Sequence, residues 1–75
     1  QVKAKLDYYS FWKRMRGVLD GLKAGRSPKR AAAYPHPEYA ARVITYMQGI
    51  PIDALAQMSI IDVRRRWQRE QEKVV

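Results

Sequence analysis

The feature that most constrains the fold is a run of apolar and aromatic residues at helical spacing in the first third of the chain. They recur every three or four positions: Tyr8, Phe11, Trp12, Met15, Val18, Leu19 and Leu22. This spacing predicts an amphipathic helix over residues 3–24 that ends near Gly25, with Gly17 and Gly21 inside it at some cost to helix propensity. The rest of the sequence needs the apolar side of this helix for its core.

The second half of the chain predicts three further helices. Pro37 suits the first turn of a helix over about residues 37–49, and Gly49 ends it. Its expected buried side consists of Tyr39, Ala40, Val43, Ile44, Met47 and Ile50. A short helix follows from Pro51, with these residues expected to point inward: Ile52, Leu55, Ala56 and Met58.

Ser59 is a suitable N-cap for a final helix over about residues 60–73. Four apolar residues share one side of this helix: Ile60, Val63, Trp67 and Val74. No segment alternates apolar and polar residues as a strand would. The sequence therefore predicts an all-α, small four-helix domain.

A basic connector joins the first two predicted helices over residues 25–37. It contains three prolines and no apolar periodicity, which argues against a long regular element. Its thirteen residues exceed the usual length of a helix–helix loop, so we expect it to touch a partner or to wrap the core. We interpret the whole chain, 1–75, as a single domain made of residues 1–24, the connector and residues 38–75.

The size of the chain points to outside support for its small core. A chain of 75 residues buries only about 60% of the surface that its unfolded form exposes. Cysteine is absent, so disulfides and thiolate metal sites are excluded. The single histidine, His36, cannot form a zinc site or a catalytic triad unaided. A partner surface is the remaining source of stabilisation.

The charge of the chain is strongly positive and unevenly distributed. The net charge is +8 and the pI is near 10.2, which favours nucleic acid, an acidic protein surface or anionic lipid as partner. Residues 1–37 carry nine Lys or Arg against two Asp, whereas residues 38–75 carry six against five acidic residues. The first half is therefore the electrostatic half of the chain.

In the second half, the positive charge is concentrated in Arg64, Arg65, Arg66 and Arg69. Arg65 and Arg69, four apart, project almost opposite the apolar side of the final helix, so they face a partner. In the alternative interpretation, Arg66 pairs at i,i+4 with Asp62 and Glu70 on a solvated surface. That pairing leaves Arg64, Arg65 and Arg69 uncompensated.

The chain from Pro37 onward resembles the helix-turn-helix superfamily of DNA-binding modules. The resemblance rests on a scaffold helix ending in Gly (39–49), a short helix carrying Leu-Ala (50–58) and a following helix ending in Arg-Arg-Trp (59–67). It implies a recognition helix whose outer side carries Ile61, Asp62, Arg65, Arg66 and Arg69, with Arg65 on a guanine edge or a phosphate. Where the superfamily has a small turn residue and a buried aliphatic residue, this chain has Ile60 and Arg66, as though the turn were about two residues short.

We therefore predict a small basic nucleic-acid-binding protein, with DNA favoured over RNA, acting as a DNA-binding or transcription-associated accessory factor. Five residues are expected to contact phosphates: Lys13, Arg14, Arg26, Lys29 and Arg30. Three are expected to read bases or clamp the backbone: Arg64, Arg65 and Arg69. The expected location is the cytoplasm or the nucleoid.

The alternative is a non-enzymatic structural subunit of a large assembly, such as a ribosome-associated, phage-particle or polymerase-associated protein, that is ordered by its partners. A homodimer is a further alternative. In it, Tyr34, Tyr46 and Ile61, as apolar groups beyond those that the core needs, would form the dimer contact. Tyr9 lies on the same side of the predicted helix as Lys13, where it can make an external contact such as stacking against an unpaired base.

The sequence predicts no enzyme, cofactor or metal site. His36 and Glu38 make no catalytic set, the aspartates are scattered, and the glycines form no phosphate-binding loop. No apolar run approaches the roughly 18–20 residues that span a bilayer, so we expect no membrane partner.

Overall fold

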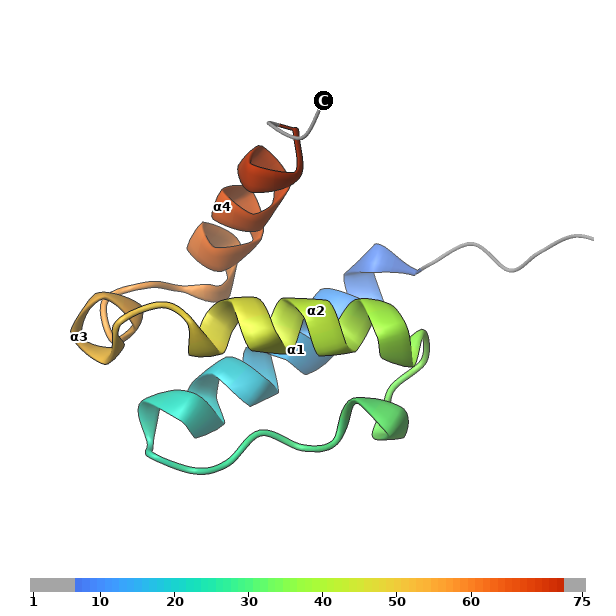
Figure 1. The fold of residues 1–75 in the computed structure, drawn as a ribbon, viewed down its shortest axis with the longest axis horizontal. Helices are drawn as coiled ribbons and strands as arrows, with labels where there is room; N and C mark the ends of the chain where they lie inside the picture. Colours follow the sequence, from blue (N-terminus) through green and yellow to red (C-terminus); the bar gives the residue numbers. More distant parts are fainter. Residues whose placement is uncertain (1–6, 73–75) are drawn as a thin grey trace, which may run out of the picture.

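The computed structural model describes residues 7–72, and the regular elements within this range are all helices. The elements are α1 (Tyr8–Lys23), the 3-10 turn η1 (Ala31–Ala33), α2 (Pro37–Gln48), α3 (Ile52–Leu55) and α4 (Ile60–Glu72). In Figure 1, α2 crosses in front of α1, α4 projects away from this pair, and the connector runs alongside them from the end of α1 to the start of α2. The prediction of an all-α domain with four α-helices is confirmed for the described residues.

The first helix begins later than its apolar spacing predicts. Asp7 has an extended backbone conformation, and its Oδ1 accepts a hydrogen bond of 3.2 Å from the Ser10 backbone N–H. This N-cap starts the helix at Tyr8, so the predicted continuous helix through Asp7 is wrong; residues 3–6 lie outside the described residues.

The end of α1 is a Schellman motif centred on Gly25. Gly25 has a φ of 79°, and the Arg26 N–H donates a hydrogen bond of 2.8 Å back to the Gly21 carbonyl. The Gly25 N–H donates another, of 3.0 Å, to the Leu22 carbonyl. This turn reverses the chain and brings the connector back beside α1.

Local signals also start the later helices. Pro37 occupies the first turn of α2, as predicted, after His36 in the left-handed conformation with a φ of 57°. Asp62 Oδ2 accepts a hydrogen bond of 2.9 Å from the Ser59 N–H, and the Asp62 N–H donates one of 3.3 Å to Ser59 Oγ. This reciprocal capping box confirms Ser59 as the N-cap of α4. The predicted helical residue 73 and the apolar Val74 lie outside the described residues.

The core combines side chains from α1, the connector, α2 and α4 with Ile50 and Leu55. Its members are Phe11, Trp12, Met15, Val18, Leu19, Tyr34, Ala40, Val43, Ile44, Met47, Ile50, Leu55, Val63 and Trp67. Three residues that were predicted to be buried are instead exposed: Tyr8, Ile52 and Ala56. Tyr8 lies on the first turn of α1, at the edge of the core, and α3 is a single turn that buries only Leu55.

The connector wraps the core, as one of the two interpretations of its length predicted. Tyr34 is only 9% exposed and belongs to the core, and Ala31 packs partly against it. The suggestion that Tyr34 contributes to a dimer contact is therefore wrong. Over the described part of the chain, no helix combines the length and hydrophobicity needed to cross a membrane.

Candidate nucleic-acid interface

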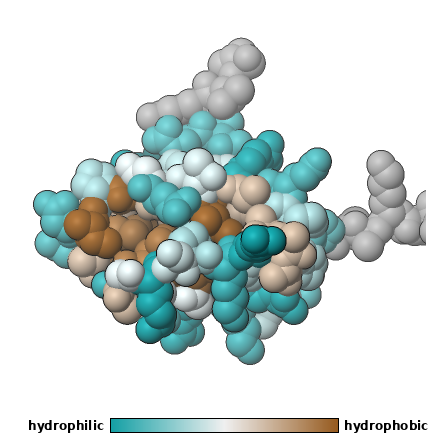
Figure 2. Space-filling model, turned by 60° about the horizontal axis from the view of Figure 1, so that its bottom comes forward, coloured by the Kyte–Doolittle hydropathy of each residue, from teal (hydrophilic) through white to brown (hydrophobic). Residues whose placement is uncertain are grey.

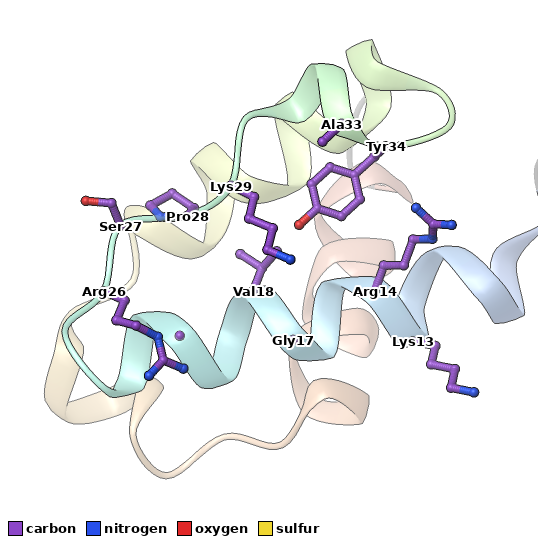
Figure 3. Close-up of a pocket in the computed structure, with 11 residues that line it drawn as sticks. Lys13, Arg14, Gly17, Val18, Arg26, Ser27, Pro28, Lys29, Ala33 and Tyr34 are labelled. Carbon is purple, nitrogen blue, oxygen red and sulfur yellow. The ribbon is translucent and has the colours of Figure 1, made fainter.

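A basic hollow with a volume of about 510 Å³ lies between α1 and the connector. Lys13 and Arg14 line it from α1, and Arg26 and Lys29 line it from the connector. In Figure 3 the Lys29 side chain reaches toward α1, whereas the Lys13 side chain points away from the connector. We call this hollow the α1–connector groove. Four of the five predicted phosphate-contacting residues therefore line one hollow, although the two pairs are twelve or more residues apart in sequence.

The electrostatics of this groove are one-sided. All four basic side chains are exposed, and none of the lining residues within the range 7–72 is acidic. Cations that share a concave surface raise the local positive potential, and binding of a phosphate backbone releases counterions. Hydrophobic surface lies between hydrophilic side chains on the face of the molecule that carries the connector (Figure 2).

Tyr34 adds a neutral donor to the groove. Its ring is packed in the core, but the residue also lines the groove, and Figure 3 shows its hydroxyl pointing toward the space between Lys29 and Arg14. Burial raises the pKa of the Tyr34 hydroxyl, and the nearby Arg14 charge opposes this shift only in part. The group therefore stays protonated at neutral pH and can donate a hydrogen bond to an anionic oxygen.

Two glycines, Gly17 and Gly21, lie on the α1 side of the groove, and packing within the protein does not require glycine at either position. A methyl group placed on Gly17 would meet no other atom within 4 Å, and one on Gly21 would lie at ordinary contact distance, 3.8 Å, from Arg26 Nε. Each glycine costs a helix about 1 kcal/mol relative to alanine. Gly17 leaves the backbone of α1 open to a ligand in the groove, whereas Gly21 lies next to the Arg26 side chain.

The arginines of α4 line a second hollow, of about 370 Å³, together with Met58, Asp62 and Glu70. Arg65, Arg66 and Arg69 provide its positive charge, and we call it the α4 hollow. Unlike the α1–connector groove, it mixes both signs of charge.

The Asp62 carboxylate at the edge of the α4 hollow is engaged within its own capping box. It accepts hydrogen bonds from the backbone N–H of Ser59, at 2.9 Å, and from the Ser59 hydroxyl, at 3.1 Å. These bonds are the main cause of its lowered pKa, with smaller contributions from the Arg65 and Lys23 charges. The hydrogen bonds of Asp62 therefore go to Ser59 rather than to Arg66, the partner that the alternative interpretation assigned to it.

The remaining predicted residues lie elsewhere. Arg64 lines a cleft between α1 and α4, where Lys13 and Arg16 also lie. Arg30 is exposed in the connector, where its carbonyl accepts the hydrogen bond that starts η1. The three arginines that were expected to act together therefore lie at two places: Arg65 and Arg69 line the α4 hollow, and Arg64 lines the other cleft.

Three residues of the α1–connector groove were not predicted from the sequence: Gly17, Gly21 and Tyr34. The spacing of the two glycines, four apart inside an amphipathic helix, was a usable signal, because it places both on one side of the helix. Arg66 was expected on the outer side of the last helix, but it was left out of the expected contacts because its i,i+4 neighbours are acidic. Nothing in the local sequence of Tyr34 indicates that its ring is buried while its hydroxyl reaches a groove.

No protein-family model, curated protein or solved structure matches the chain. The resemblance to helix-turn-helix modules therefore stays a prediction from the sequence. Among residues 7–72, no three His, Asp or Glu side chains are grouped closely enough to hold a metal ion.

Proposed function

We propose that this chain is a non-enzymatic nucleic-acid-binding domain that holds a phosphate backbone in the α1–connector groove. The observation that carries the proposal is that Lys13, Arg14, Arg26 and Lys29 all line a hollow whose described lining is free of acidic side chains. Lysine and arginine side chains that contact phosphates position a protein on nucleic acid without reading its sequence.

Two other features of the groove support a phosphate ligand. The Tyr34 hydroxyl supplies a neutral hydrogen-bond donor beside the cations. Gly17 lets a bulky sugar–phosphate backbone come close to α1, since no other atom lies within 4 Å of the place where its side chain would begin. DNA is favoured over RNA because of the helix-turn-helix resemblance, in which Arg65 and Arg69 form a second contact to the duplex.

The test is a titration of labelled duplex DNA by fluorescence anisotropy between about 50 and 200 mM salt. Four phosphate contacts give a slope of log K against log salt of about −3.6. The double variant Arg26→Gln/Lys29→Gln should weaken binding and reduce the slope by about two units.

A control of equal charge separates the groove from the net charge of the protein. Arg16→Gln/Arg42→Gln removes two exposed cations that do not line the groove. It should leave the slope nearly unchanged. If both double variants weaken binding equally, the groove is not the site and only the overall charge attracts DNA.

A structural subunit of a larger assembly is the second candidate function. It is favoured by three apolar or aromatic side chains that remain largely in solvent: Tyr9, 78% exposed, Ile52, 60%, and Ile61, 58%. Tyr9 and Ile61 line the same cleft, and contiguous exposed apolar surface is typical of protein–protein contacts. Cooperative unfolding of the isolated chain with tight, salt-dependent DNA binding supports the first candidate; partial disorder with weak, sequence-independent binding supports the second.

A further inference from the structure

A second site, separate from the proposed nucleic-acid function, lies in the cleft between the N-terminal half of α1 and the first turns of α4. This α1–α4 cleft has a volume of about 220 Å³. Its apolar lining consists of Trp12, Ile60 and Ile61, with the aromatic ring of Tyr9 beside them. Ile60 packs partly against the core, whereas Ile61 and Tyr9 are mainly exposed.

The charged lining of the cleft is entirely positive in the described part of the chain. Lys13 and Arg16 enter it from α1, and Arg64 enters it from α4. All three side chains are exposed. The combination of an apolar floor with a cationic rim is complementary to a negatively charged ligand that also carries a large apolar group.

The floor also contains an unsatisfied donor. Trp12 is only 4% exposed, and its Nε1 has no hydrogen-bond partner among residues 7–72. Buried N–H groups are nearly always paired in folded proteins. A buried donor without a partner in the described part of the chain therefore lies in a residue that lines the cleft, and the Nε1 atom itself is covered by its surroundings.

We propose that the α1–α4 cleft docks an acidic peptide segment of a partner protein, which places one large aliphatic or aromatic side chain between Tyr9 and Ile61 and carboxylates against Arg16 and Arg64. A second copy of the chain fits less well, because each copy carries a net charge of +8. Nucleic acid fits less well because two residues of the apolar lining, Ile60 and Ile61, are isoleucines, which offer no flat surface for base stacking.

The experiment measures anisotropy of a fluorescein-labelled short peptide of Asp and Glu that contains one leucine, titrated with the full chain. Arg16→Gln/Arg64→Gln should weaken binding about fivefold, and Ile61→Ser about tenfold. Arg65→Gln/Arg69→Gln, which removes equal charge from the α4 hollow, should change it less than twofold. Lys13 is left intact because it lines both this cleft and the α1–connector groove.

Four results would overturn the proposal. Equal losses in the two arginine double variants would show that the peptide follows net charge alone. Equal affinity for a peptide with serine in place of leucine would show that the apolar floor is not used. Stronger binding of single-stranded oligo(dT), lost in Ile61→Ser, would assign the cleft to nucleic acid, and a dimer abolished by Ile61→Ser would assign it to a second copy.

This test is independent of the proposed DNA function. Arg26→Gln/Lys29→Gln should leave peptide binding intact, because neither residue lines the cleft. Conversely, Ile61→Ser should leave binding in the α1–connector groove intact.

Discussion

Trp67 Nε1 donates a hydrogen bond of 2.9 Å to the hydroxyl of Tyr39, which joins α4 to α2. The same two rings pack edge to face with their centroids 5.9 Å apart, and the Tyr46 ring also packs edge to face against Trp67, with centroids 5.3 Å apart. This contact orients α4, so it determines which arginines face α1 and which face away.

Tyr39→Phe should destabilise the fold by about 1 kcal/mol, because it leaves the part-buried indole N–H without an acceptor while keeping the ring. Urea denaturation followed by tryptophan fluorescence measures this loss. Tyr9→Phe is the matched control, since Tyr9 is 78% exposed and its change should be close to zero. Equal effects of the two substitutions would contradict a role for the Tyr39–Trp67 bond.

Asp62→Asn should reduce the dependence of stability on acid pH. Hydrogen bonds from Ser59, with smaller contributions from Arg65 and Lys23, lower the pKa of Asp62 below its ordinary value of 3.8 in the folded state. The stabilisation is therefore fully present above pH 3.8 and is lost as the pH falls through the lower folded value. Thermal unfolding between pH 7 and pH 2 should show a shallower acid loss in the variant. Asp20→Asn, which keeps the Asp62 carboxylate, should retain the steeper loss.

Gly17→Gln should increase the stability of the protein and decrease its affinity for DNA. The position is open, so a side chain with better helix propensity should stabilise α1 by roughly 1 kcal/mol. The same side chain projects into the α1–connector groove and should weaken DNA binding severalfold if a phosphate backbone lies there. Thermal unfolding and DNA anisotropy test the two halves of the prediction. A stabilised variant with unchanged affinity would place the DNA elsewhere.

Arg65→Ala/Arg69→Ala should abolish DNA binding while preserving helicity, if α4 forms the second contact to the duplex. Both side chains are exposed, so the far-ultraviolet circular dichroism spectrum should not change. A gel-shift titration measures the loss. Unaltered affinity would count against α4 as part of the interface and would leave the α1–connector groove as the whole site.

The helices and most of their ends could be predicted from the sequence, because the causes act over a few residues. Apolar spacing, the Ser59 cap, Pro37 at the first turn and the glycine at the end of α1 each operate within about one helical turn. The errors at Asp7 and Ile52 arose where one capping side chain or a very short helix overrode the apolar spacing.

The basic residue types, their number and their concentration in the first half were also evident from the sequence. Their grouping was a property of the tertiary structure alone. Arg26 and Lys29 line the same hollow as Lys13 and Arg14 only because Gly25 reverses the chain and Tyr34 anchors the connector in the core. Arg64 and Arg65 are neighbours in sequence, yet successive residues of a helix point about 100° apart, and the packing of Trp67 against Tyr39 decides which hollow each one lines. Local chemistry thus specifies the helices, whereas a shared surface requires contacts between residues far apart in the chain.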